Sequence, residues 1–231
     1  MARQGAAFSP LQAALALAGC GIPVCPFHHP RVDGSGWVAS MVCSCDRPQC
    51  LQPCAHPQPP EGLAAATTDP DRIRLWWDDT PDANVGLLTG VVCDVIDTDP
   101  DTGRRAFRVL ARRSSGLGPV ARTGTGRWLF FTAPSGRPGG VLADSDDGTA
   151  HPGPLVRWRG LDGSVLAPPS RTLLGNAARW AHPFATELPD PYELGQVLTD
   201  TVTDPDDDEE SGRLARLFAP VRRAGSRALL G

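Results

Sequence analysis

Two cap-and-proline pairs, Ser9-Pro10 and Asp69-Pro70, each place a capping side chain directly before a proline of the first helical turn. The first pair predicts an amphipathic helix over residues 9–20. The second predicts a helix whose apolar face comprises Ile73, Trp76 and Trp77. Because short apolar runs follow both helices, we expect an α+β fold of two packed α/β subdomains.

Short apolar runs bounded by glycine or proline predict the strands. The chain has 25 glycines and 24 prolines among its 231 residues, so many turns and long connections are expected. The runs predict a strand at 22–27, a pair of strands within 84–98, a strand at 128–132 and one or two strands within 155–167. Asp101 opens a third predicted helix, whose apolar face comprises Ala106, Phe107, Val109 and Leu110.

These elements place one domain at residues 9–185, with a loop rich in Cys, Pro and His at 28–60 inside it. Residues 186–231 are predicted to form an acidic linker and a short basic helix. The net charge is −4, but acidic residues gather at 204–210, so the charge argues only weakly against a nucleic-acid partner. All basic residues are arginine, which suits bidentate phosphate contacts, although a bias towards GC-rich codons explains the absence of lysine equally well.

The apolar segments of the sequence indicate where in the cell the protein is expected. No apolar run reaches the ~20 residues that a membrane-spanning helix needs. The first residues lack the long apolar centre and the small-residue cleavage site of a signal peptide. A cytoplasmic protein without a membrane partner is therefore expected.

The cysteines are clustered, since four of the seven lie between Cys43 and Cys54. Three thiolates and an imidazole suit a closed structural Zn²⁺ site, and the predicted ligands are Cys43, Cys45, Cys50 and His56. Cys54, His28 and His29 are alternative ligands, and free, reduced cysteines in a loop are the other interpretation. Coordination would order a loop with few apolar residues, which favours the metal. The cysteines expected in the core are Cys20, Cys25 and Cys93.

Two carboxylates, Asp97 and Asp99, follow the apolar pair Val95-Ile96. Side chains alternate along a strand, so both carboxylates are expected on one face, roughly 6–7 Å apart along the strand. Such a pair suits Mg²⁺ or Mn²⁺, and two of these ions can activate a 3′-hydroxyl and stabilise a leaving pyrophosphate. A simple turn is the alternative, because Asp-Pro-Asp-Thr-Gly is common in turns and helix caps.

A series of motifs surrounds this acidic pair. In order, they are Ala66-Thr67-Thr68-Asp69, Trp76-Trp77, Ala83-Asn84-Val85-Gly86-Leu87, Thr89-Gly90, Val95-Ile96-Asp97-Thr98-Asp99, Gly126-Arg127-Trp128-Leu129-Phe130-Phe131, Arg159-Gly160 and Ala167-Pro168-Pro169-Ser170. The series resembles the bifunctional DNA primase/polymerase N-terminal domain of the archaeo-eukaryotic primase superfamily, over roughly residues 9–183. The resemblance implies an RRM-like catalytic half and template-directed nucleotidyl transfer with Asp97 and Asp99 as metal ligands. It also implies single-stranded DNA and nucleoside triphosphates as partners.

Two positions depart from the catalytic pattern of that family. Trp128 stands where the family has a His that helps to hold the triphosphate, and Arg157 stands where it has a third acid. An arginine beside two divalent ions is electrostatically disfavoured and would instead pair with a carboxylate. Three explanations follow: catalysis is lost and binding retained, the alignment is shifted, or another acid substitutes, namely Asp144, Asp146, Asp147 or Asp162.

The predicted contacts to a nucleotide or nucleic acid are Arg127, Trp128, Arg159 and Ser170. The arginines would contact phosphates, and Ser170 a phosphate or a sugar hydroxyl. The alternatives are ordinary surface arginines, a tight turn and a loop cap. A helicase would have to be a separate chain, because the sequence has no Gly-x4-Gly-Lys-Ser/Thr motif. The hypotheses are an active primase/polymerase, an inactive binding module, and a zinc-stabilised protein-interaction domain.

Overall fold

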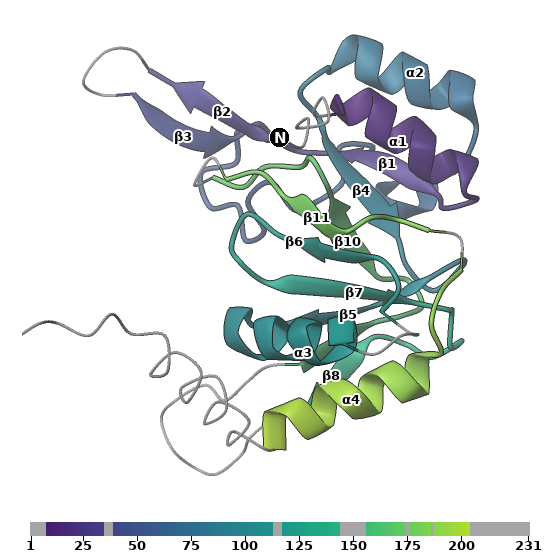
Figure 1. Ribbon diagram of the computed structural model, residues 1–231. Coiled ribbons are helices and arrows are strands. Elements are labelled where there is room, and N and C mark those ends of the chain that lie inside the picture. The colour runs from purple at the N-terminus through teal and green to yellow at the C-terminus, as the bar shows by residue number, and fades with distance from the viewer. Residues whose placement is uncertain are drawn as a thin grey trace, which may run out of the picture.

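The computed structural model describes residues 8–34, 39–112, 117–143, 156–173, 176–185 and 187–203. Its helices combine with antiparallel sheets, which confirms the predicted α+β class. Figure 1 shows one pair of α-helices on the outer face of a small sheet and another pair on the outer face of a larger sheet, as the element order gives them. The two sheets therefore lie between the two pairs of helices.

The small sheet has the strand order β1-β4-β10, so β4 is its central strand. Its strands are β1 (Val24–Phe27), β4 (Asn84–Leu88) and β10 (Ser164–Ala167). Helices α1 (Pro10–Gly19) and α2 (Pro70–Asp79) pack against this sheet and against each other (Figure 1).

The larger sheet has the strand order β11-β6-β7-β5-β9-β8, so β5 lies between β7 and β9. Its strands are β5 (Asp94–Thr98), β6 (Val120–Arg122), β7 (Trp128–Thr132), β8 (Gly140–Ala143), β9 (Val156–Arg159) and β11 (Arg179–His182). Helices α3 (Pro100–Arg112) and α4 (Pro191–Thr203) lie side by side on its outer face (Figure 1).

A hairpin of β2 (Pro30–Asp33) and β3 (Ser40–Cys43) projects from this body (Figure 1). The 3-10 helix η2 (Gly62–Ala65) lies in the long connection from β3 to α2. The predicted Cys- and His-rich loop therefore consists of a hairpin followed by an irregular segment.

Both predicted helix starts are confirmed by their caps. The Ser9 hydroxyl accepts a hydrogen bond from the Gln12 amide at 3.2 Å, and the Gln12 side chain accepts one from the Ser9 amide at 3.0 Å. This reciprocal pair is a capping box. The Asp69 carboxylate accepts the Asp71 amide at 3.0 Å, with Pro70 in the first turn.

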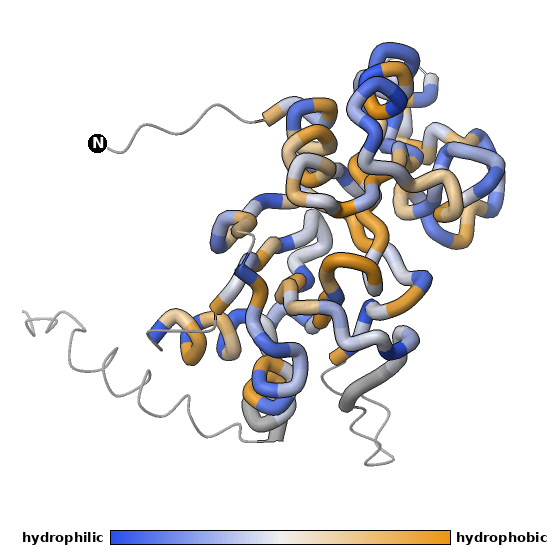
Figure 2. Tube along the Cα trace, turned by 90° about the vertical axis from the view of Figure 1, so that its right-hand side faces the viewer, coloured by the Kyte–Doolittle hydropathy of each residue, from blue (hydrophilic) through white to orange (hydrophobic). Residues whose placement is uncertain are grey.

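The core has two parts, one on each side of the larger sheet. Between the sheets, Leu87 of the small sheet belongs to one cluster with Val95 and Phe131 of the larger one. On the other side, Ile96 and Trp158 pack with residues of α3 and α4. Figure 2 shows orange and blue residues alternating along the helices, as expected for helices that bury one face.

The pair of strands predicted within 84–98 divides between the two sheets, since β4 and β5 do not pair with each other. The run within 155–167 divides in the same way, into β9 and β10. These two connections, which cross from one sheet to the other, contact each other, because the Thr89 hydroxyl donates to the Gly160 carbonyl at 2.7 Å and the Thr89 amide to the Gly163 carbonyl at 2.9 Å. Gly90 has a φ of +89°, and a Cβ there would lie 2.4 Å from Leu161 Cα.

Helix α4 is an element that the sequence analysis did not predict. It lies within the range assigned to the linker, and its Leu194 and Leu198 are buried in the core under the larger sheet. The acidic run at 204–210 and the predicted basic helix beyond it fall outside the described residues. Among the helices of the described residues, none has the length and apolar character to cross a bilayer.

Candidate functional site

A cavity of about 700 Å³ lies where the two sheets meet, and residues of both halves line it. The larger sheet contributes Asp97 and Leu129, and the crossing connection contributes Gly163. The small sheet contributes Phe27 and Val165. The polar residues of interest in its wall are Asp97, Thr123, Thr125, Arg127, Arg159 and Ser170.

Asp97 is the acid at the centre of this wall, and its side chain is only 7% exposed. Its Oδ1 accepts Arg127 Nε at 2.6 Å, and its Oδ2 accepts Arg159 Nη2 at 3.1 Å. Arg127 Nη2 also donates to the Asp97 carbonyl at 3.3 Å. The register explains the arrangement: Asp97 faces Leu129 of β7, and Arg159 stands two residues from Arg157, which faces Asp97 on β9. Alternation therefore puts Asp97 and both guanidinium groups on one face.

Asp99 has a different environment. Its Oδ1 accepts the amides of Asp101 at 2.9 Å and Thr102 at 3.0 Å, and so it caps α3. Its Oδ2 is buried and has no hydrogen-bond partner within the described part of the chain. Asp97 and Asp99, which the sequence analysis expects on one strand, therefore have different surroundings. Asp97 faces the cavity, whereas Asp99 begins a helix.

The position expected to carry a third acid is occupied by Arg157, which faces Asp97 across the β5–β9 ladder. Arg157 is exposed, and it forms no ion pair within the described ranges. Of the substitute acids, Asp162 is exposed and lines the cavity. The others, Asp144, Asp146 and Asp147, lie outside the described residues. Among the described side chains, the single group of three or more close metal-ligating residues is the Cys/His cluster.

Trp128 lies on the opposite face of the larger sheet from Asp97. It is 8% exposed, faces Thr98 across the ladder and packs against Phe107 of α3 with ring centroids 5.1 Å apart. Gly103 permits this packing, because a Cβ there would lie 2.4 Å from Trp128 Cγ. The predicted contact of Trp128 with a nucleotide stays a prediction, and its packing gives it a structural role.

The turn between β6 and β7 borders the cavity through Thr123, Gly124 and Thr125. Gly126 has a φ of +89°, a conformation that favours glycine. The Thr123 and Gly126 amides close the turn by donating to the carbonyls of Arg127 and Thr123. Within the described residues, the Gly124 and Thr125 amides donate to no protein acceptor.

Ser170 and Asn84 join the small sheet to its surroundings. The Ser170 hydroxyl accepts the Val85 amide at 2.9 Å, and Ser170 is 3% exposed. The Asn84 amide group donates to the carbonyls of His28, Cys54 and Arg171 at 2.8–3.0 Å. These two motif residues therefore hold backbone segments together, while Ser170 also borders the cavity.

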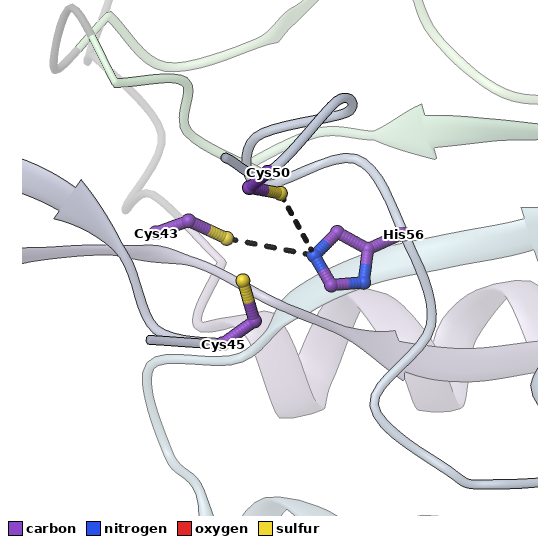
Figure 3. A group of neighbouring side chains, drawn as sticks. All are labelled: Cys43, Cys45, Cys50 and His56. Carbon is purple, nitrogen blue, oxygen red and sulfur yellow. Dashed lines mark hydrogen bonds between the residues drawn. The ribbon is translucent and has the colours of Figure 1, made fainter. Parts of the chain in front are cut away.

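The ligand atoms of Cys43, Cys45, Cys50 and His56 lie within 4.8 Å of one another (Figure 3). His56 Nε2 is 3.6 Å from Cys43 Sγ and 3.4 Å from Cys50 Sγ. Figure 3 shows the side chains converging on one point from the end of β3 and the following loop. The four predicted ligands are thus together, and a cluster of three cysteines and a histidine could bind zinc.

Cys54 and the two other histidines stand beside this cluster. The Cys54 amide donates to Cys43 Sγ at 3.2 Å, and burial raises the pKa of the Cys54 thiol to about 12. The His28 and His56 rings lie 4.3 Å apart and are tilted by 38°, and His28 shares a hydrogen bond with the Ser44 hydroxyl. Burial, and then the nearby His56, lowers the pKa of His28 to about 4, so its ring is neutral. These residues support the cluster from outside it.

The buried residue that sequence reasoning missed is Asp94, which is fully buried at the start of β5. Its Oδ2 accepts the Ser135 amide at 2.9 Å, the Ser135 hydroxyl at 2.5 Å and Trp158 Nε1 at 3.1 Å. The sequence feature that could have identified Asp94 is an acid inside an otherwise apolar run. Its neighbour Cys93 and the distant Cys25 are core residues, as predicted, and burial raises the pKa of both thiols to about 12.

Comparison with known proteins assigns the family. The model of the family described as bifunctional DNA primase/polymerase, N-terminal, matches residues 14–191. No curated protein matches the chain. The match covers both sheets, the Asp97 cavity and the Cys/His cluster, and extends over well more than half of the sequence. The chain therefore belongs to the family of bifunctional DNA primase/polymerase N-terminal domains.

Proposed function

We propose that this domain binds nucleotides or nucleic acid through phosphate groups in the Asp97 cavity, without two-metal nucleotidyl transfer. The observation that carries the proposal is the pairing of both Asp97 oxygens with guanidinium groups, Arg127 at 2.6 Å and Arg159 at 3.1 Å. A carboxylate held in this way neutralises part of the positive charge and fixes the two arginines in place.

The donors of the cavity suit an anion. Arg127 and Arg159 converge on Asp97, and the exposed Arg157 lies on the same face of the sheet, while the exposed Asp162 adds a second carboxylate to the cavity wall. The free amides of Gly124 and Thr125 add two neutral donors at the rim, within the described part of the chain. Guanidinium forks and backbone amides are the donors that bind phosphate oxygens in proteins.

Two divalent ions fit this arrangement poorly. Both oxygens of Asp97 are engaged, and one oxygen of Asp99 caps α3. Two metal ions at close distance need several free carboxylate oxygens that can bridge them. The third acidic position supplies Arg157 instead, so the site has the wrong charge for two closely spaced cations.

The first experiment compares triphosphate binding by the Asp97→Asn variant and the wild type, by calorimetry in EDTA. An anion site predicts about tenfold tighter binding by the variant, because one negative charge near the ligand is removed (~1.4 kcal/mol). The double variant Arg127→Gln/Arg159→Gln is expected to bind at least about tenfold more weakly, since it loses charge-assisted bonds.

The matched controls are Asp78→Asn and Arg72→Gln/Arg74→Gln, which make the same charge changes on the exposed face of α2. Both are expected to bind like the wild type. Unchanged binding by Arg127→Gln/Arg159→Gln, or binding that requires Mg²⁺ or Mn²⁺, would contradict the proposal and favour metal-bound nucleotide.

The active primase/polymerase is the second candidate, and one observation favours it. Asp99 Oδ2 is buried without a partner in the described residues, as expected for an oxygen that awaits a cation. Asp97 and Asp99 would then hold Mg²⁺ or Mn²⁺, after Arg127 and Arg159 move to the triphosphate. Metal-dependent primer extension on single-stranded DNA that disappears in Asp97→Asn/Asp99→Asn would support this function. A separate helicase partner stays a prediction.

For the Cys/His cluster we propose a structural Zn²⁺ site with Cys43, Cys45, Cys50 and His56 as ligands. Four protein ligands close a tetrahedral site, so the ion would stabilise the fold and leave no position for a substrate. None of the seven cysteines forms a disulfide. A thiolate site of this kind fits a reducing compartment, in line with the expected cytoplasmic location.

A further inference from the structure

A second cavity, of about 420 Å³, lies on the other side of the turn between β6 and β7. Arg122 and Arg179 line it, together with Asn176 and an edge of Trp128. Thr123 and Gly124 of the turn line both this cavity and the Asp97 cavity. The turn is therefore a shared wall with arginines on either side of it.

Arg122 and Arg179 stand directly opposite each other in the β6–β11 ladder. Residues in this position have Cβ atoms about 4.5–5.5 Å apart, and two like charges there destabilise the sheet. Both side chains are exposed, and within the described residues neither has an acidic partner. Within the described part of the chain, this like-charged pair is therefore left to solvent or to an external anion.

The arrangement holds one of the two guanidinium groups in place. The Arg122 guanidinium lies 5.8 Å from the centre of the Trp128 ring. Trp128 is itself fixed by Gly103 and Phe107 of α3. A cation held over a buried aromatic ring keeps its outer N–H groups free to donate to a ligand.

We infer that Arg122 and Arg179 bind a phosphate of a single nucleic-acid strand whose neighbouring phosphates enter the Asp97 cavity. This inference rests on the proposed function, because it extends the anion site across the shared turn. A mononucleotide fills one cavity, whereas a strand places phosphates on both sides of Thr123 and Gly124. Gly124 lines both cavities and Thr125 lines the Asp97 cavity, and within the described residues their amides donate to no protein acceptor.

The test uses the whole chain and the double variant Arg122→Gln/Arg179→Gln. Binding of a fluorescein-labelled oligothymidylate is measured by anisotropy over a series of salt concentrations, and binding of a nucleoside triphosphate by calorimetry. The variant is expected to bind the oligonucleotide at least about tenfold more weakly. The slope of the logarithm of its binding constant against the logarithm of the salt concentration should be shallower by about one to two units. Its triphosphate affinity is expected to match that of the wild type. The control is Arg72→Gln/Arg74→Gln on α2, with the same change in charge.

Each other outcome has a definite meaning. If the variant and the control lose oligonucleotide affinity equally, the effect is general charge and the inference is wrong. If the variant loses triphosphate affinity but keeps oligonucleotide affinity, the pair binds a free nucleotide and the strand is excluded. If wild type binds the triphosphate while the variant binds the oligonucleotide normally, the proposed function stands and this inference fails. If wild type binds neither ligand, both fail.

Discussion

At the scale of single residues, several residues of the sequence motifs form hydrogen bonds with backbone groups. Asn84 binds three carbonyls from separate segments, and Ser170 holds the start of β4. Asp97 is the exception, because its partners are arginine side chains facing a cavity. Residue identity alone does not separate these roles, since a buried Asn or Ser and a ligand-binding one look the same in a sequence.

Asp94→Ala is expected to lower the free energy of unfolding by about 2–3 kcal/mol. The reason is that the Ser135 amide and Trp158 Nε1 lose their acceptor inside the core. Urea denaturation followed by circular dichroism measures the change. Asp78→Ala, which removes an exposed acid from α2, is the control and is expected to change stability by less than about 0.5 kcal/mol. A loss no larger than that of the control would show that Asp94 makes no net contribution.

At the scale of elements, the segment from β2 to η2 stands apart from the two cores. Of its residues, Cys43, Cys54 and Ala65 are buried hydrophobics, whereas Val32, Met41 and Leu51 are exposed. Too little apolar surface is buried there to order a long irregular connection. The Cys/His cluster is therefore the feature that can hold this segment together.

Removal of the metal is expected to loosen this segment while the sheets remain folded. Cys50→Ser should abolish the binding of one equivalent of zinc per chain, measured by elemental analysis. Hydrogen exchange should become faster over residues 40–60 and stay unchanged in β5 and β7. Cys20→Ser, a half-buried cysteine outside the cluster, is the matched control. Wild-type protein that contains no zinc after expression with the metal would contradict the assignment.

At the scale of the whole molecule, two of the connections that cross between the sheets meet each other beside the cavity. Residues 89–93 lead from β4 to β5, and residues 160–163 lead from β9 to β10. They contact each other through Thr89, and Gly90 passes close to the backbone of Leu161. The relative position of Asp97 and the small sheet depends on this junction.

Gly90→Ala is expected to destabilise the protein by more than about 2 kcal/mol and to weaken triphosphate binding. The added Cβ would meet the Leu161 backbone at 2.4 Å, at a φ of +89°. Gly19→Ala is the matched control, because Gly19 ends α1 and no atom lies within 4 Å of its Cβ position. The control should be neutral or slightly more stable. Equal thermal stability of the two variants would show that the junction tolerates a side chain.

The sequence by itself determined the elements and the ligand sets that depend on local spacing. The caps at Ser9 and Asp69, the strand that carries Asp97 and the Cys/His cluster follow from neighbouring residues. Only the tertiary structure decided that β4 and β5 belong to different sheets, that α4 joins the core, and that Arg127 and Arg159 meet on Asp97. The physical reason is that strand pairing and side-chain convergence depend on residues far apart in the chain, whose register no local pattern specifies.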